Sequence, residues 1–160
     1  MPLLELTVPE GELSDEARGE LQGELAGALL RWEGAPDTEF FRSISWCHLQ
    51  ELPADSIRTP DGSAEPHAVV KVTTPEGALS DRRRAGMVEE MTKLVLEATG
   101  WGDQAALRVW VMCREIDEGS WAAGGQIVHF EQLREAAKAE REKAGSGRDE
   151  VPAAKTAATA

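Results

Sequence analysis

The feature that most constrains the fold of this chain is an internal repeat. Residues 7–15 read Thr-Val-Pro-Glu-Gly-Glu-Leu-Ser-Asp and residues 73–81 read Thr-Thr-Pro-Glu-Gly-Ala-Leu-Ser-Asp, so seven of nine positions are identical. The offset that takes Thr7 to Thr73 also relates, without a gap, Arg42 to Arg108 and Cys47 to Cys113. A register held over such a length predicts a duplicated structural unit.

Each copy is expected to fold as strand, helix, strand. A short apolar run ends at a Pro-Glu-Gly turn in both copies, and a serine suited to cap a helix follows. Apolar residues then recur at helical spacing until a glycine that can end the helix. The boundaries predicted in this way are first strands at 3–8 and 69–73, N-caps at Ser14 and Ser80, helix ends at Gly34 and Gly100, and second strands at 40–49 and 106–114.

The connection between the two strands of each copy is long enough to carry a helix, which implies parallel pairing. We therefore expect an α/β (α+β) fold, in which tandem βαβ repeats form one four-stranded sheet with two helices on one face. The expected organisation is a fused domain at 2–130 (unit one 2–51, a proline-rich linker 52–66, unit two 67–130), an exposed helix at 131–143 and a disordered tail at 144–160.

Composition excludes several classes of protein. A formal net charge of −12 argues against a nucleic-acid partner, and no apolar run is long enough to span a membrane. Two cysteines and the absence of a signal-like N-terminus favour a cytoplasmic location. Three scattered histidines offer no metal site, so neither a metal nor another cofactor is expected.

The proline at position 2 offers unusual chemistry. Removal of Met1, which we expect, would make Pro2 a secondary amine, whereas an internal proline is an amide without a basic lone pair. Free α-amines titrate at about 7.7–8.0, and burial lowers that pKa further. A pKa near cellular pH suits a general base. The alternative interpretation is that Pro2 merely begins an edge strand.

Three further motifs of the sequence support an interpretation together with Pro2. Pro-Glu-Gly-x-Leu-Ser-Asp follows the first strand of both copies, Leu-Arg-Val at 107–109 opens the last strand, and Gly-Ser-Trp-Ala-Ala-Gly-Gly occupies 119–125. Together with Pro2 these residues resemble the tautomerase superfamily, whose founding type is 4-oxalocrotonate tautomerase. The fused length resembles the long subgroups, such as cis-3-chloroacrylic acid dehalogenase and malonate semialdehyde decarboxylase.

The resemblance implies a catalytic Pro2, a homotrimer, and substrate binding by Arg108 or Arg42 and by Trp121 of the hairpin. An arginine fork can bind a carboxylate bidentately, although each arginine could instead pair with an acid of the chain. Trp121 could equally be a core or interface aromatic. Position 68, the counterpart of Pro2, is an internal alanine, so one active site per chain is expected.

The sequence departs from the family pattern in one respect. The turns after the first strands, which carry an arginine in the short tautomerases, have none in this chain. The leading hypothesis is keto-enol proton transfer on a small 2-oxo acid or related carbonyl compound. The alternatives are a dehalogenase or decarboxylase that uses cationic Pro2, and a tautomerase-like scaffold that binds without turnover.

Overall fold

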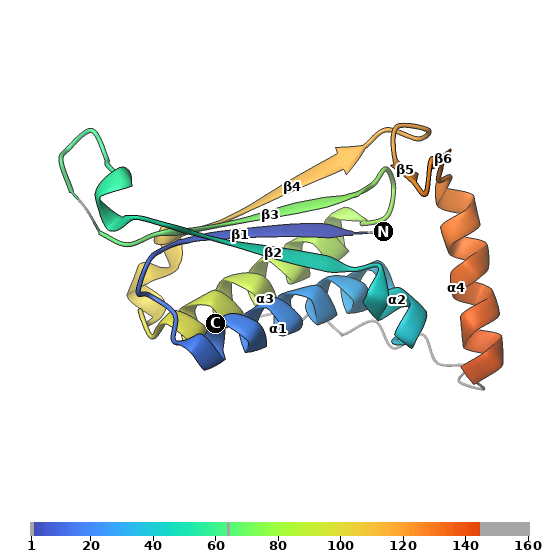
Figure 1. Cartoon of the computed structure of the whole chain (residues 1–160), viewed down its shortest axis with the longest axis horizontal. Coiled ribbons are helices and arrows are strands. Elements are labelled where there is room, and N and C mark those ends of the chain that lie inside the picture. The colour runs from blue at the N-terminus through green and yellow to red at the C-terminus, as the bar shows by residue number, and fades with distance from the viewer. Residues whose placement is uncertain (1, 64, 145–160) are drawn as a thin grey trace, which may run out of the picture.

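The computed structural model describes residues 2–63 and 65–144. Its centre is a four-stranded sheet with the order β2-β1-β3-β4, and two long helices cover one face of that sheet (Figure 1). This architecture is the one that the repeat predicts. The elements of the two units are β1 (Leu3–Pro9), α1 (Asp15–Glu33), β2 (Trp46–Leu52), β3 (Ala68–Pro75), α3 (Asp81–Thr99) and β4 (Val109–Ile116).

The two long helices begin and end where the sequence predicts. The Ser14 hydroxyl accepts a hydrogen bond from the Ala17 amide at 3.1 Å, and Ser80 caps α3 in the same way. Gly34 and Gly100 follow the last helical residues with φ angles of 73° and 69°, a left-handed conformation that glycine adopts without steric cost. Local capping chemistry is therefore sufficient to set these boundaries.

The strand directions determine where the two units place their ends. β1 pairs with β2 in parallel, β3 pairs with β4 in parallel, and β1 meets β3 antiparallel. Leu3, at the start of β1, lies opposite Thr73, near the end of β3. Pro2 and Ala68 consequently lie at opposite ends of the sheet.

The core lies between the sheet and the two helices. Alternate residues of β1 point into it, with Leu4, Leu6 and Val8 at most 1% exposed. The predicted helical stripes meet these strand residues from the other side. The buried helix residues are Leu21, Leu25 and Leu29 in α1 and Met87, Met91 and Val95 in α3. Each fully buried side chain of this kind stabilises the fold by about 1.5–3 kcal/mol.

The predicted starts of the second strands are wrong. Residues Glu39–Ser43 form a short helix, α2, whose N-terminus is capped by Thr38, and β2 begins only at Trp46. In unit two, Asp103–Arg108 form a 3₁₀ helix, η2, before β4. Thr38 followed by Glu39 is a helix-start signal, and it outweighs the β propensity of the phenylalanines that follow. Arg42 and Arg108 therefore lie in helical turns rather than within strands.

The gapless repeat also fails in the second strands. In unit one, Leu3 lies opposite Trp46. The offset of the repeat takes Leu3 to Val69 and Trp46 to Met112, yet Val69 lies opposite Trp110. The connection in unit two is therefore two residues shorter than that in unit one. Arg42 thus precedes its strand by more residues than Arg108 does, and the two arginines are not structural counterparts.

The C-terminal segment crosses the end of the sheet at which β1 begins. A small hairpin, β5 (Ala122–Ala123) and β6 (Gln126–Ile127), leads into helix α4 (Phe130–Ala144). Helix α4 stands beside α2 (Figure 1), and Ala137 packs with Leu30 and Phe41 in a second small core. The tail predicted at 144–160 lies outside the described residues from 145 onward. No helix among the described residues is long and apolar enough to cross a membrane.

The opposite end of the sheet carries the connection between the units. β2 runs into this connection through the short 3₁₀ helix η1 (Ala54–Ser56), and β3 leaves it at Ala68. The connection extends beyond the layers of the sheet and helices (Figure 1). The proposed division into units at 2–51 and 67–130 remains a prediction.

Candidate functional site

Pro2 lines a cleft of about 690 Å³ at one end of the sheet. The floor and sides come from the end of α1, the turn after β3 and helix α4, three segments far apart in the sequence. Pro2 itself is buried, and its carbonyl oxygen accepts a hydrogen bond from the Trp46 amide at 3.3 Å. The first residue pair of the β1–β2 ladder therefore fixes Pro2 at the cleft wall.

Glu33 also lines this cleft. Burial raises the pKa of its carboxyl to about 7. A carboxyl whose pKa lies near 7 can give and take protons near neutral pH. The cleft thus holds a group suited to acid–base work beside the start of the chain.

Two arginines bind the carboxyl-terminal end of α1. Arg83 Nη1 donates to the Glu33 carbonyl oxygen at 3.2 Å, and Arg141 donates to the Gly34 carbonyl oxygen. Such carbonyls have no partner within the helix, and cations are favourable there. The two arginines therefore join α3 and α4 to the end of α1, which keeps the three walls of the cleft together.

Arg42 and Trp121, two of the predicted substrate-binding residues, lie outside the cleft lining. Arg42 forms a bidentate pair with Asp37 at 2.5 and 2.7 Å, and the pairing lowers the pKa of that carboxyl. Trp121 is half-buried in the hairpin, where its carbonyl oxygen accepts a hydrogen bond from the Val128 amide. Neither residue is among those that surround Pro2 within the described part of the chain.

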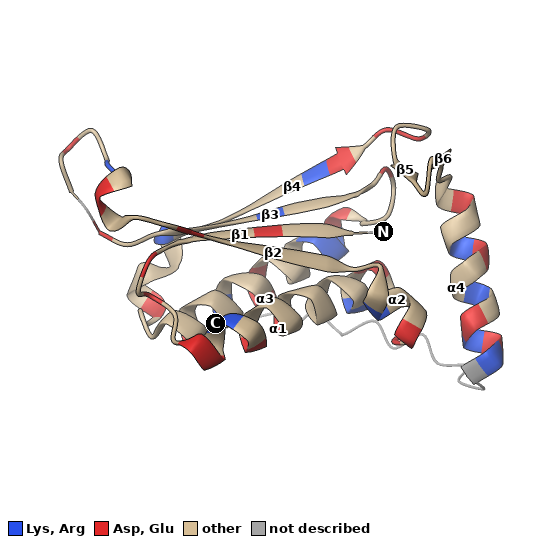
Figure 2. Ribbon diagram, in the orientation of Figure 1, with Lys and Arg blue, Asp and Glu red and all other residues tan. Residues whose placement is uncertain are grey.

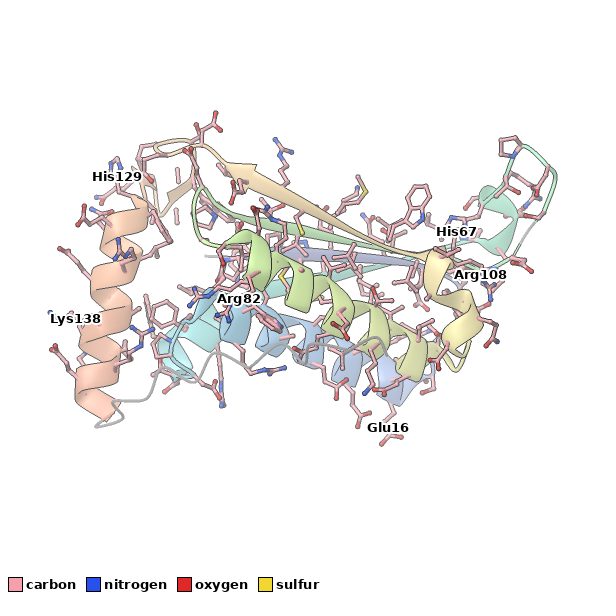
Figure 3. All side chains as sticks on the ribbon, turned by 180° about the vertical axis from the view of Figure 1, so that it is seen from behind. Glu16, His67, Arg82, Arg108, His129 and Lys138 are labelled. Atoms are coloured by element: carbon pink, nitrogen blue, oxygen red, sulfur yellow. The ribbon has the colours of Figure 1, made fainter. Side chains whose placement is uncertain are left out.

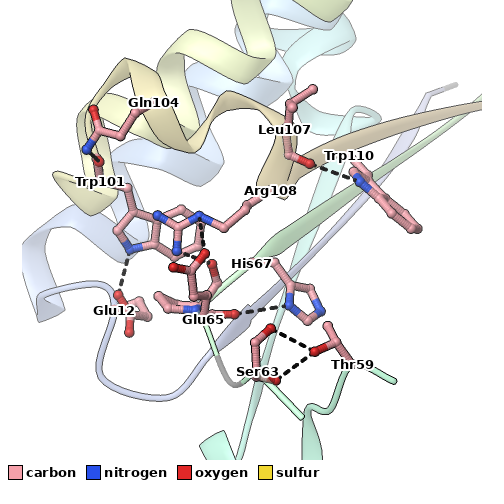
Figure 4. A network of polar contacts seen from close by, with 11 residues as sticks. Glu12, Thr59, Ser63, Glu65, His67, Trp101, Gln104, Leu107, Arg108 and Trp110 are labelled. Carbon is pink, nitrogen blue, oxygen red and sulfur yellow. Dashed lines mark hydrogen bonds and ion pairs between the residues drawn. The ribbon is translucent and has the colours of Figure 1, made fainter. Parts of the chain in front are cut away.

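Arg108 lies at the opposite end of the sheet from Pro2. Its guanidinium stacks over Trp101 at 5.5 Å, donates to the Pro66 carbonyl oxygen at 3.0 Å and lies 3.7 Å from a Glu65 carboxylate oxygen. Figure 4 shows this cluster, and Figure 3 shows Arg108 far from Lys138 of α4. Within one chain, therefore, the structure does not bring Arg108 and Pro2 together.

The sequence predicts an exposed helix at 131–143 but not that this helix, α4, borders Pro2, and it gives no role to Glu33. For α4 a signal was present, because Arg134, Lys138 and Arg141 recur at helical spacing and must share one face. Nothing local marked Glu33, whose environment depends on packing between distant segments. No group of three or more His, Cys, Asp or Glu side chains suited to a metal ion occurs among residues 2–63 and 65–144.

No protein-family profile and no curated protein matches the chain, but solved structures resemble it. A crystal structure of native Ps01740 has 26% identity and a TM-score of 0.63, covering 76% of this chain and 98% of its own. Pt0534 inactivated by 2-oxo-3-pentynoate has 22% identity and a TM-score of 0.67, with coverages of 78% and 95%. A fused 4-OT, solved as an asymmetric trimer, has 21% identity and a TM-score of 0.66, with coverages of 78% and 94%.

These likenesses extend over both units and almost the whole of each solved chain. The finer resemblance to the dehalogenase and the decarboxylase remains a prediction. The sheet order, the pair of helices on one face and the duplicated βαβ unit agree with the same interpretation. The chain therefore has the fold of the tautomerase superfamily.

Proposed function

We propose that this chain is a tautomerase that moves a proton between the enol and keto forms of a small 2-oxo acid or related carbonyl compound, with Pro2 as the catalytic base. The observation that carries the proposal is the burial of Pro2 on the wall of a cleft that also holds Glu33. The proposal requires the removal of Met1, which leaves the Pro2 nitrogen as a secondary amine.

The chemistry needs no cofactor. The neutral Pro2 nitrogen takes the proton from the enol hydroxyl, and the electrons of that O–H bond form the carbonyl. The electrons of the C=C bond take a proton at carbon from the Pro2 cation, which restores the neutral amine. Burial disfavours the charged amine and so keeps Pro2 available as a base near neutral pH.

The other predicted substrate residues remain part of the proposal. Arg42 lies at the Pro2 end of the sheet, but it would have to leave Asp37 to reach a substrate. Arg108 would have to enter the Pro2 cleft of a second copy. A homotrimer offers that arrangement, and the fused 4-OT relatives are trimers. Trp121 would likewise have to reach a Pro2 cleft from its place in the hairpin.

The test is Pro2→Ala, with loss of Met1 confirmed by intact mass for both proteins. Ketonisation of phenylenolpyruvate and 2-hydroxymuconate should slow by about 10²–10⁴-fold, the usual contribution of a general base. The matched control keeps Pro2 but places one uncleaved residue before it, which turns the amine into an amide and should abolish the same activity. Wild-type rates in either variant would refute the proposal.

One observation favours a second candidate. Gly77 and Ala78 of the turn after β3 line the cleft without a charged side chain, so a scaffold that binds without turnover remains an alternative, as does acid chemistry by cationic Pro2. A pH–rate profile separates base from acid chemistry, because a base works above its pKa and an acid below it. Wild-type protein that turns over none of these substrates would favour the scaffold.

A further inference from the structure

Helix α4 presents one continuous face to the Pro2 cleft. The α4 residues of that face recur at helical spacing and include Arg134, Lys138 and Arg141. Positions separated by four and then three residues lie above one another on a helix. Three cations are therefore directed to the same side, and Figure 2 shows basic residues along α4, at the end of the sheet where β1 begins.

The position of α4 is fixed at several points. Glu118 accepts hydrogen bonds from the Phe130 amide at 3.2 Å and from His129 at 2.6 Å, which caps the first turn of the helix. Ala137 packs into the small core formed with Leu30 and Phe41. Further along, Arg141 bonds to the Gly34 carbonyl oxygen. The basic face thus has a defined place opposite Pro2.

The cations of the cleft are not equally available to a ligand. Arg83 and Arg141 are engaged with the carbonyl oxygens at the end of α1. Arg134 and Lys138 have exposed side chains and no hydrogen-bond or ion-pair partner among residues 2–63 and 65–144. These two side chains can therefore turn to an anion without breaking an existing contact.

Acidic groups also border the cleft, and they must be weighed against the cations. Glu131 and Glu135 of α4 line it together with Glu33. Glu33 is partly neutral near pH 7, because burial raises its pKa to about 7. Four cations therefore face between two and three negative charges, in a chain whose formal net charge is −12. The cleft is an electropositive region on an otherwise acidic molecule.

We propose that Arg134 and Lys138 form the anion-binding wall of the Pro2 cleft and select substrates that carry a carboxylate. This inference rests on the proposed function for its substrate, and it places the carboxylate site on α4 rather than on the turn after β3. The turn after β3 lines the cleft only with uncharged residues. Helix α4, which follows the repeat, therefore supplies the cations that bind the carboxylate. An acidic chain repels anions at long range, and a local pair of cations is what allows one to bind.

The experiment measures binding directly, so that it does not depend on turnover. Isothermal titration calorimetry compares cinnamate with cinnamamide, which has the same shape but no charge. The double variant Arg134→Gln/Lys138→Gln keeps helix-forming side chains and removes both cations. Wild type should bind cinnamate at least about tenfold more tightly than cinnamamide, as charge-assisted hydrogen bonds allow, and the double variant should lose that preference.

Lys143→Gln is the matched control, because it removes one cation from α4 away from the cleft, where Lys143 pairs with Glu140. This variant should retain the preference for cinnamate. Equal binding of both compounds by wild type, or an unchanged preference in the double variant, would overturn the inference even if Pro2 proves catalytic. Conversely, a Pro2→Ala variant that retains full ketonisation activity but prefers cinnamate would overturn the proposed function alone.

Discussion

The two ends of the sheet are products of the same duplication, yet one is open and the other is filled. At the Pro2 end, Ala35 and Ala78 line the cleft. The offset of the repeat relates Ala35 to Trp101 and Ala78 to Glu12. At the Ala68 end these two counterparts meet in a hydrogen bond of 2.6 Å from Nε1 to Oε2. The Ala68 end thus has a contact between a tryptophan and a carboxylate where the Pro2 end has two alanines that line a cleft.

The two copies therefore differ in structure at corresponding ends of the sheet. Arg108 stacks on Trp101 and adds to the packing at the Ala68 end, whereas α4 borders the cleft at the Pro2 end. The hydrogen bond to its carbonyl oxygen holds Pro2 at the cleft. Its counterpart Ala68 is an internal residue. One active site per chain remains a prediction.

The change with the largest expected effect gives the Pro2 end the tryptophan that the Ala68 end has. Ala35→Trp should occupy the cleft and reduce kcat/KM for ketonisation by about 100-fold, the size of effect that misplacement of a substrate by about 1 Å produces. Ala35→Ser is the matched control and should remain close to wild type. Near-normal activity in Ala35→Trp, with the tryptophan in place, would mean that substrate does not use this cleft.

In the contact between α1 and α3, Gly86 packs against the ring of Trp32. Gly86→Ala tests this contact. A Cβ at Gly86 would lie 2.3 Å from Cη2 of the buried Trp32, so we expect a loss of about 1–3 kcal/mol in the free energy of unfolding. Gly23→Ala, at an exposed helical position with nothing within 4 Å, should instead stabilise by up to about 1 kcal/mol. Urea denaturation measures both.

The last residues of the two long helices also differ, because α1 ends at Glu33 and α3 ends at Thr99. Native Glu33 has a pKa of about 7 and the ordinary value is 4.5, so the native state binds more protons between these pH values. Stability therefore falls as pH rises through that window, by about 1 kcal/mol once partial exposure is considered.

Glu33→Gln should flatten this pH dependence and leave the variant more stable than wild type at pH 8. Denaturation curves at pH 4.5, 6 and 8 measure the difference. A wild-type stability that rises between pH 4.5 and 7, with the same rise in Glu33→Gln, would assign the dependence to other groups. Thr99 donates its hydroxyl to the Val95 carbonyl oxygen at 2.8 Å, so unit two contributes no such titration at this position.

The smallest effect concerns the filled end. Trp101→Phe keeps most of the packing but removes the hydrogen bond to Glu12, and we expect a loss of about 1 kcal/mol in stability with unchanged ketonisation. Trp110→Phe, at a side chain that is 64% exposed, should change stability by less than about 0.5 kcal/mol. Loss of activity in Trp101→Phe would show that the two ends are coupled.

Most of the fold was predictable because its signals are local. Ser14 and Gly34 mark the ends of α1 by capping chemistry alone, and the repeat carries that reasoning to α3. The shift of β4 relative to the repeat was not predictable, since it follows from the length of η2 and its packing. The site divides in the same way: Pro2 is visible in the sequence, whereas the titration of Glu33 depends on which distant segments surround it.

The shorter connection in unit two has an implication for how a duplicated sheet can diverge. Side chains alternate between the two faces of a strand, so a shift of the register by an even number of residues keeps the same side chains on each face and an odd shift exchanges the faces. Trp46 and Trp110 consequently both point to the face without helices and are 60% and 64% exposed. A slip of β4 by a single residue against β3 would instead place Trp110 beneath the helices and Val109 in solvent. The connection between β3 and β4 therefore differs in length from that between β1 and β2, and the same face of both second strands still meets the helices.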